Sequence, residues 1–215
     1  VLLAMPELCC LGGAIGDAGA TRVAAELSDP STSVDHVDLR GNGIGDPGAA
    51  ALAHALRYNR TVRVLRLWNN NVQTAGASLL IAALEHNNTL TELDLGHNKA
   101  RGDEIAPAIA AMLPHNGRLQ RLDLRYCAMT DEGALTVASA LERNSGLRLL
   151  DLRYNQIDFE GAKALALALS QNDTPLRVLV KANALSDQGA AELATFLQGD
   201  PLLAALAEGQ ERFWF

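Results

Sequence analysis

A unit of about 28 residues is repeated along the chain, and this repetition limits the folds that are open to it. The stretch "LDLRYNQIDFEGAKALALAL" (150–169) closely repeats "LDLRYCAMTDEGALTVASAL" (122–141), which lies one unit earlier. One position in each unit holds Asn, or once Cys, and the spacing between these anchor residues is constant except for a single additional residue between Asn98 and Cys127. A fixed period of this length is typical of stacked units in a solenoid. The anchors are Asn42, Asn70, Asn98, Cys127, Asn155 and Asn183.

Within each unit the spacing of apolar residues changes. Leu or Val stands three and five residues before each anchor, as at Leu122 and Leu124, and this alternation predicts a short strand. After the anchor, apolar residues recur at offsets of three and four, as at Ala134, Val137 and Leu141, and this spacing predicts a helix. The residues expected to cap these helices are Asp46, Thr74, Asp103, Asp131 and Asp187.

The pattern resembles the leucine-rich repeat family, and specifically its ribonuclease-inhibitor-like subclass. The motif L-x-x-L-x-L-x-x-N/C-x-L appears as "LTELDLGHNKA", "LQRLDLRYCAM" and "LRLLDLRYNQI". The resemblance implies an α/β fold, a right-handed solenoid or horseshoe with parallel strands on its concave face and helices on its convex face. Because the family accepts Cys in the anchor position, Cys127 is expected to be a buried, inert thiol. The second Asn of the subclass is matched by Asn59, Asn87, Asn116, Asn144 and Asn172.

A single domain is expected over residues 1–215. Residues 1–33 would form a degenerate N-terminal repeat, residues 34–198 the regular repeats, and residues 199–215 a degenerate C-terminal cap. Since Val1 falls inside a degenerate repeat, we expect the chain to belong to a longer polypeptide. Phe213, Trp214 and Phe215 are expected either to cover the C-terminal end of the solenoid or to dock into another protein.

Composition excludes several classes of partner. The formal net charge of −7 argues against nucleic acid, whose phosphates require a cationic surface. Three cysteines are too few for a disulfide framework and favour a reducing, cytoplasmic compartment. No apolar run reaches the roughly 18 residues that a membrane-spanning helix needs, so no membrane insertion is expected.

No cofactor, metal or catalytic group is expected. The five histidines lack H-x-x-x-H spacing, and no nucleophile motif is present. The segment "GIGDPG" (43–48) matches the dinucleotide-binding motif G-x-G-x-x-G. The equivalent segments "NVQTAG", "AMTDEG" and "ALSDQG" indicate that the repeat itself supplies these residues. The N-x-T sequons at Asn59, Asn87 and Asn172 fall in the recurrent Asn turn and are interpreted as by-products of the repeat.

Side chains between the inward-facing leucines predict a binding surface on the concave face. Aromatic residues among arginines have the composition of binding hot spots, and the chain has few aromatic residues. The rings of Tyr126 and Tyr154 occupy one column of adjacent units and should lie side by side at roughly 5 Å. The residues expected to contact a partner are Arg40, Trp68, Arg125, Tyr126, Arg153, Tyr154 and Lys181.

The position four residues before the anchor is mostly Asp, so that successive units form an acidic column beside the arginines. Asp123 and Asp151 stand two residues before Arg125 and Arg153, on the same face of their strands. The repulsion between the two like charges is expected to be removed either by these aspartates, paired with the arginines along one strand or diagonally between strands, or by an acidic partner.

The favoured function is a non-enzymatic protein-interaction module or scaffold, acting within a larger assembly in the cytoplasm. The repeats resemble those of cytosolic immune receptors and of ciliary or cytoskeletal scaffold proteins. An alternative is a GTPase-activating accessory of a small GTPase, because Ran GTPase-activating protein has the same type of repeat. Arg101, in the loop with the extra residue, would be its candidate arginine, although the acidic tail of that family is missing from this sequence.

Overall fold

The computed structural model describes residues 7–199 and 213–214. Strands and helices alternate along this part of the chain. The strands are β1 (Glu7–Cys9), β2 (His36–Asp38), β3 (Val64–Arg66), β4 (Glu92–Asp94), β5 (Arg121–Asp123), β6 (Leu149–Asp151), β7 (Arg177–Leu179) and β8 (Phe213–Trp214). The helices are α1 (Gly16–Ser28), α2 (Asp46–Tyr58), α3 (Thr74–Ala83), α4 (Gly102–Met112), α5 (Asp131–Leu141), α6 (Phe159–Gln171) and α7 (Asp187–Gln198).

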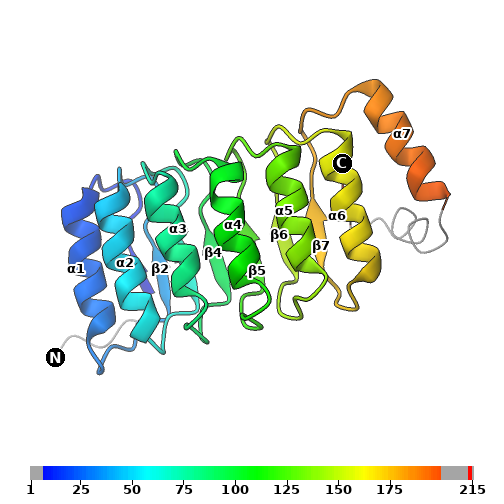
Figure 1. The fold of residues 1–215 in the computed structure, drawn as a ribbon. Helices are drawn as coiled ribbons and strands as arrows, with labels where there is room; N and C mark the ends of the chain where they lie inside the picture. The colour runs from blue at the N-terminus through cyan, green and yellow to red at the C-terminus, as the bar shows by residue number, and fades with distance from the viewer. Residues whose placement is uncertain (1–6, 200–212, 215) are drawn as a thin grey trace.

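The strands form one parallel sheet in sequence order, from β1 to β8. Equivalent positions pair between neighbouring units, so that Leu93 lies between Leu65 and Leu122. The helices stand in a row along one face of the sheet, and the other face, which we call the open face, carries no helix of the described chain (Figure 1). This arrangement confirms the α/β solenoid predicted from the repeat.

The core lies between the sheet and the helices. The residues three and five positions before each anchor are buried, and Leu122 and Leu124 are 0% exposed. They pack against the helix face that the spacing of three and four predicted, for example Ala134 and Val137. Each unit buries its apolar side only by stacking on its neighbours, which is why the repetition determines the fold.

A ladder of asparagine side chains holds the turns after the strands. The side-chain amide of Asn155 donates to the carbonyl oxygens of Leu124 and Leu152, both at 2.9 Å. Its side-chain oxygen accepts from the backbone N–H groups of Cys127 at 2.9 Å and Met129 at 3.0 Å. One side chain thus satisfies four buried backbone groups from two units, which explains the Asn at this position.

The second set of asparagines satisfies the helix ends. Asn87 is fully buried and donates to the carbonyl oxygen of Leu56, while its side-chain oxygen accepts from the N–H groups of Thr89 and Leu90. Asn59 and Asn172 are similarly buried and bonded. The three sequon asparagines are therefore structural, as interpreted above.

None of the residues predicted as N-caps caps its own helix, since Asp46, Thr74, Asp103, Asp131 and Asp187 all lie inside the first turn. Asp46 is the first residue of α2, not its cap, and its carboxylate accepts from the N–H groups of Gln73 at 2.7 Å and Gly76 at 3.1 Å. It therefore caps the helix of the next unit. This correction could not come from local spacing, because the capped groups lie a whole unit further along the chain. Asp17, Asp103 and Asp131 do the same for α2, α5 and α6, and the observed N-caps are Gly45, Gln73, Arg101, Thr130, Asp158 and Ser186.

The C-terminal unit departs from the row. Figure 1 shows α7 tilted away from α6, and Ala190, whose equivalents in α2 to α6 are buried, is exposed. The backbone of Phe213 and Trp214 continues the sheet by pairing with Val178 and Leu179 of β7. The side chains of these two residues, and all of Phe215, lie outside the described part of the chain, so their expected capping or docking role stays a prediction.

Candidate functional site: an aromatic cluster at the rim of the sheet

Four aromatic side chains gather where β3, β4, β5 and β6 end. The rings of Tyr126 and Tyr154 are stacked, with centroids 4.5 Å apart and an interplanar angle of 4°. This confirms the predicted stacking of the two tyrosines. Tyr126 also makes edge contacts with His97 at 5.4 Å and Trp68 at 5.9 Å, and Trp68 stacks on His97 at 5.5 Å. We call Trp68, His97, Tyr126, Tyr154 and Arg125 the rim cluster.

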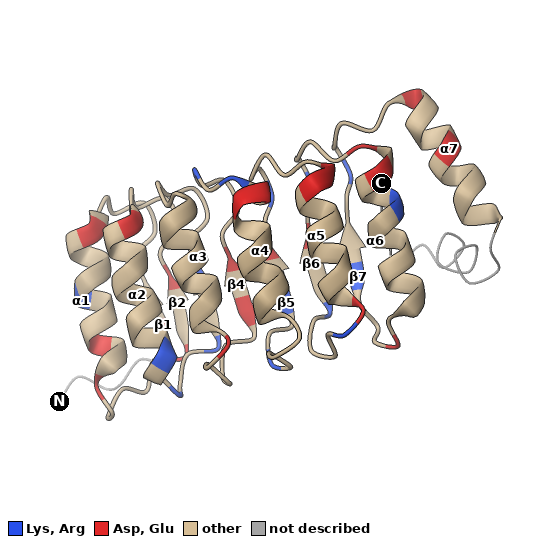
Figure 2. Ribbon diagram, in the orientation of Figure 1, with Lys and Arg blue, Asp and Glu red and all other residues tan. Residues whose placement is uncertain are grey.

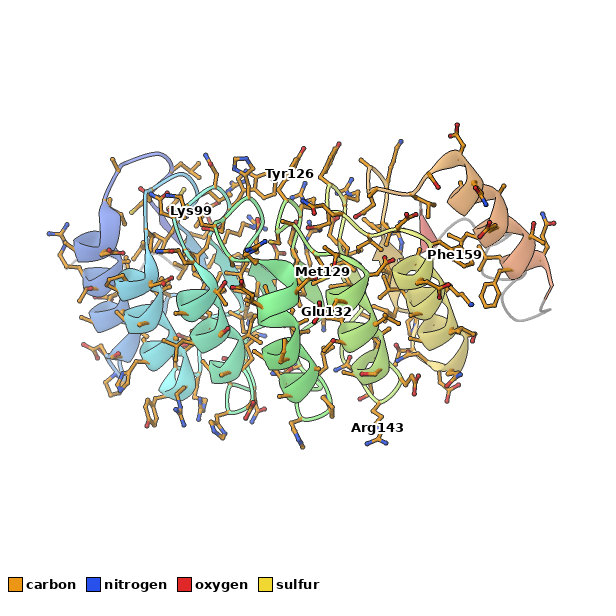
Figure 3. The ribbon with its side chains drawn as sticks, turned by 45° about the horizontal axis from the view of Figure 1, so that its top comes forward. Lys99, Tyr126, Met129, Glu132, Arg143 and Phe159 are labelled. Carbon is orange, nitrogen blue, oxygen red and sulfur yellow. The ribbon has the colours of Figure 1, made fainter. Side chains whose placement is uncertain are left out.

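The backbone turns these side chains out of the sheet. Residues one position before the anchor have positive φ, which is 54° at His97, 57° at Tyr126 and 59° at Tyr154. The turn places the two tyrosines just past the strand ends, at the rim and not on the strand face where the sequence put them. Figure 3 shows Tyr126 at this rim and Arg143 at the opposite edge of the molecule. Tyr126 and Tyr154 remain 43% and 45% exposed.

Arg125 joins the aromatic rings to the charges of the open face. The guanidinium carbon of Arg125 lies 4.4 Å from the centroid of the Trp68 ring, which is a cation–π contact. Its Nη2 lies 2.7 Å from Oδ2 of Asp123, and its Nε lies 3.4 Å from Oδ2 of Asp151 on the next strand. The hydrogen bond to Asp123 raises the pKa of Arg125.

The Asp-x-Arg pairs form as predicted. Nη2 of Arg153 lies 2.6 Å from Oδ2 of Asp151, and Asp123 and Asp151 are both fully buried beneath their arginines. In β2, burial would raise the pKa of Asp38, but hydrogen bonds from Arg40 outweigh this effect and hold the pKa below its usual value. The acidic column is therefore covered, and the arginines form the outer surface.

Asp94 has no such partner on its own strand. Position 96 is Gly where β2, β5 and β6 have Arg two residues after the Asp, and the Asp94 carboxylate accepts only a backbone hydrogen bond from Gly96, at 3.0 Å. Burial and the negative charge of Asp123 raise the pKa of Asp94 to about 6. Asp94 is thus a carboxylate that titrates close to neutral pH at the centre of the sheet.

The structure brings some of the predicted contact residues together and separates others. Trp68, Arg125, Tyr126 and Tyr154 share the rim cluster, and Arg153 lies beside them, two residues after the end of β6. The remaining two lie one unit beyond the cluster on either side, Arg40 after β2, which pairs with β3, and Lys181 after β7, which pairs with β6. His97 was missed, although its position in the same column as the two tyrosines could have indicated it.

A polar hollow borders the rim cluster. It has a volume of about 440 Å³ and is open to solvent beside Tyr126, His97 and Lys99. The other lining residues are the asparagines of the turns after β3 and β4, whose buried members are already bonded to backbone groups. This hollow could receive a partner side chain next to the aromatic rings.

The other predicted features take structural places. Cys127 is buried, and burial together with Asp123 and Asp94 raises the pKa of its thiol to about 12, which leaves it unreactive. In "GIGDPG" the N–H groups of Gly45 and Gly48 donate to Asp17 at 2.7 and 3.0 Å, so a carboxylate already fills the place of a phosphate. Arg101 is 73% exposed at the start of α4, with its Nε 3.9 Å from Glu104.

Residues 7–199 contain no group of three or more His, Cys, Asp or Glu side chains that could hold a metal ion. Over the same residues, no helix has the length and apolar character that crossing a bilayer requires.

Comparison with known proteins identifies the repeat. The solved structure of Leiomodin-1 Actin-Binding Site 2 is similar, with a TM-score of 0.54 and 21% identity over 85% of this chain and 97% of that one. At this identity the likeness concerns the fold alone. None of the curated proteins compared with the chain matches it. Residues 31–53, 86–110, 115–138 and 143–166 match the Leucine Rich repeat family. The chain therefore contains leucine-rich repeats, recognised in four of its units.

Proposed function

We propose that this chain is a non-enzymatic interaction module that binds a protein partner through the rim cluster and the adjoining open face. The observation that carries the proposal is the exposed stack of Tyr126 and Tyr154. A left-handed backbone costs a residue with a side chain roughly 1–2 kcal/mol, and Gly41 occupies the same column in the β2 unit. Asn69, His97 and Ala182 share this conformation, so the repeat imposes it. Contact with a partner would account for the choice of two large, exposed aromatic side chains at positions that contribute little to the core.

The module would act inside the cell, as part of a larger assembly. Three cysteines are too few for a disulfide framework, which favours a reducing compartment. The repeats would belong to the ribonuclease-inhibitor-like subclass, which is supported by the long, nearly constant period and by helices of 10 to 13 residues in every unit from α1 to α7.

The test is a quantitative binding measurement on a partner captured from the native source. The double variant Tyr126→Ala, Tyr154→Ala should bind the purified partner about 30-fold more weakly, which corresponds to about 2 kcal/mol of binding free energy. The free energy of unfolding should fall by no more than about 1.5 kcal/mol, the value of a lost ring pair. Actin is one protein to test directly as the partner, because the similar solved structure is described as an actin-binding site.

Tyr58→Ala is the matched control. Tyr58 is the remaining tyrosine, 68% exposed on the helix side. If this variant loses the partner while the double variant keeps it, the interface lies on the helices and the proposal is wrong.

The GTPase-activating alternative has a direct assay. Single-turnover hydrolysis by a panel of small GTPases should be unchanged by the protein. Stimulation that Arg101→Ala abolishes would overturn the non-enzymatic proposal.

A further inference from the structure

The Asp-x-Arg pattern of the open face is half kept in β4 and in β7, and a different member of the pair is missing from each. β2, β5 and β6 carry both members of the pair. β4 has the acid, Asp94, without the cation, as described above. β7 has the cation without the acid, because Leu179 stands where the Asp would be and Lys181 follows it. Within residues 7–199, neither Lys181 nor Arg177 pairs with a carboxylate.

The two halves of the open face therefore differ in charge. Its side chains from the β2, β3 and β4 units include Arg40 and Arg66 against Asp38, Glu92 and Asp94. Those from the β5, β6 and β7 units include only two carboxylates, Asp123 and Asp151, against five cations. Figure 2 shows this change along the sheet, with red on β4 and blue on β7. The five cations are Arg121, Arg125, Arg153, Arg177 and Lys181.

Burial of the carboxylates makes the β5–β7 half of the open face still more positive at the surface that a partner would contact. Asp123 and Asp151 have no exposed side-chain surface, whereas the Arg153 side chain is 34% exposed and Arg177 and Lys181 are exposed. The carboxylates stabilise the arginines from below, and the guanidinium and ammonium groups face outwards. Tyr154 borders these cations, since its backbone N–H donates to the carbonyl oxygen of Lys181.

We propose that this cationic part of the open face, formed by Arg153, Arg177 and Lys181 beside Tyr154, binds an acidic protein segment. The inference rests on the proposed function and names the chemistry of its partner. Because the whole chain carries a net charge of −7, attraction of an acidic segment must come from this local surface.

An acidic segment fits better than a long polyanion. The N-terminal ends of α5 and α6, next to the rim, carry Asp131, Glu132, Asp158 and Glu160. Figure 2 shows red at these two helix ends. A nucleic acid crossing the rim would place phosphates against these carboxylates. A short protein segment can keep its acidic side chains over β6 and β7 and present another residue to Tyr154.

The test uses a fluorescein-labelled peptide of alternating glutamate and serine, with binding measured by fluorescence anisotropy. The peptide should bind the wild-type protein, and its affinity should fall as the salt concentration is raised. The double variant Arg177→Glu, Lys181→Glu should lower the affinity for the peptide by about tenfold or more. The neutral double variant Arg177→Gln, Lys181→Gln should lower it by a smaller factor. The control pair, Arg22→Glu with Arg143→Glu, makes the same change in net charge on exposed residues outside the open face and should have little effect.

Three outcomes would overturn the inference. They are equal weakening by the control pair, no binding of the peptide, and tighter binding of a single-stranded oligonucleotide or a phosphatidylserine vesicle at the same salt. The captured partner separates the two proposals. If the tyrosine double variant loses the partner while Arg177→Glu with Lys181→Glu leaves its affinity and salt dependence unchanged, the proposed function stands and the acidic-segment inference fails.

Discussion

The indole ring of Trp68 lies against the α-carbon of Gly96 and fills the space that a side chain at position 96 would need. A Cβ at Gly96 would lie 2.5 Å from Cε3 and Cζ3 of the Trp68 ring. The same Gly leaves Asp94 without the arginine that follows the other aspartates of the column. One substitution in the repeat therefore seats the tryptophan of the rim cluster and also leaves a buried carboxylate without a cation.

Gly96→Ala should displace Trp68. We expect a loss of about 1–3 kcal/mol in the free energy of unfolding, because the added methyl group overlaps the ring. In a Trp214→Phe background, Trp68 is the only tryptophan, and its fluorescence emission should shift as the ring moves. Gly117→Ala is the control, since its Cβ would meet only Ser145 Oγ at 3.8 Å. An unchanged Trp68 emission spectrum would contradict the close approach.

Asp94→Asn should stabilise the protein near neutral pH. The folded-state pKa of about 6 lies above the usual 3.8. The contribution of Asp94 to stability is therefore greatest below about pH 4 and is lost as the pH rises through about 6. We expect the variant to be more stable than the wild type by on the order of 1–3 kcal/mol at pH 7 and nearly equal at pH 4, measured by urea unfolding.

Asp38→Asn is the matched control for this pH dependence. The pKa of Asp38 is lowered in the folded state, so its carboxylate contributes stability above its usual pKa, and this contribution is lost in acid. This variant should be less stable than the wild type at pH 7. The same sign for both variants would show that the missing arginine at position 96 is not the cause.

Asn155→Ala should be strongly destabilising. The change leaves two N–H groups and two carbonyl oxygens of neighbouring turns without the partner that Asn155 supplies. We expect a loss of about 2–4 kcal/mol in urea unfolding, since unsatisfied buried polar groups are costly. Asn88→Ala, at an exposed position, should change stability by less than about 0.5 kcal/mol. A small effect of Asn155→Ala would mean that water replaces the amide.

Cys127 should resist thiol reagents until the protein unfolds. Its pKa of about 12 and its burial keep the thiolate concentration negligible near neutral pH. In a Cys9→Ser, Cys10→Ser background, labelling with a chromogenic disulfide reagent should be slow in buffer and complete in denaturant. Fast labelling in buffer would place the thiol within reach of solvent.

The sequence determined the strands, the helices and the asparagine ladder, because these depend on positions that recur once in every unit of the repeat. Its alternation placed Leu122 and Leu124 in the core, and its columns predicted the stack of Tyr126 on Tyr154. In a solenoid, equivalent positions of neighbouring units are also neighbours in space, so a column of the alignment is already a row of contacts.

Only the tertiary structure decided the features that depend on the exact approach of unlike positions. The carboxylate of Asp46 reaches the helix of the next unit, and the Trp68 ring occupies the space over Gly96. The tilt of α7 exposes Ala190, although its column predicted burial. These features depend on distances of a few ångströms between residues at different positions of the repeat. The repeat pattern shows which residues recur, but it does not give the distance between two side chains at different positions.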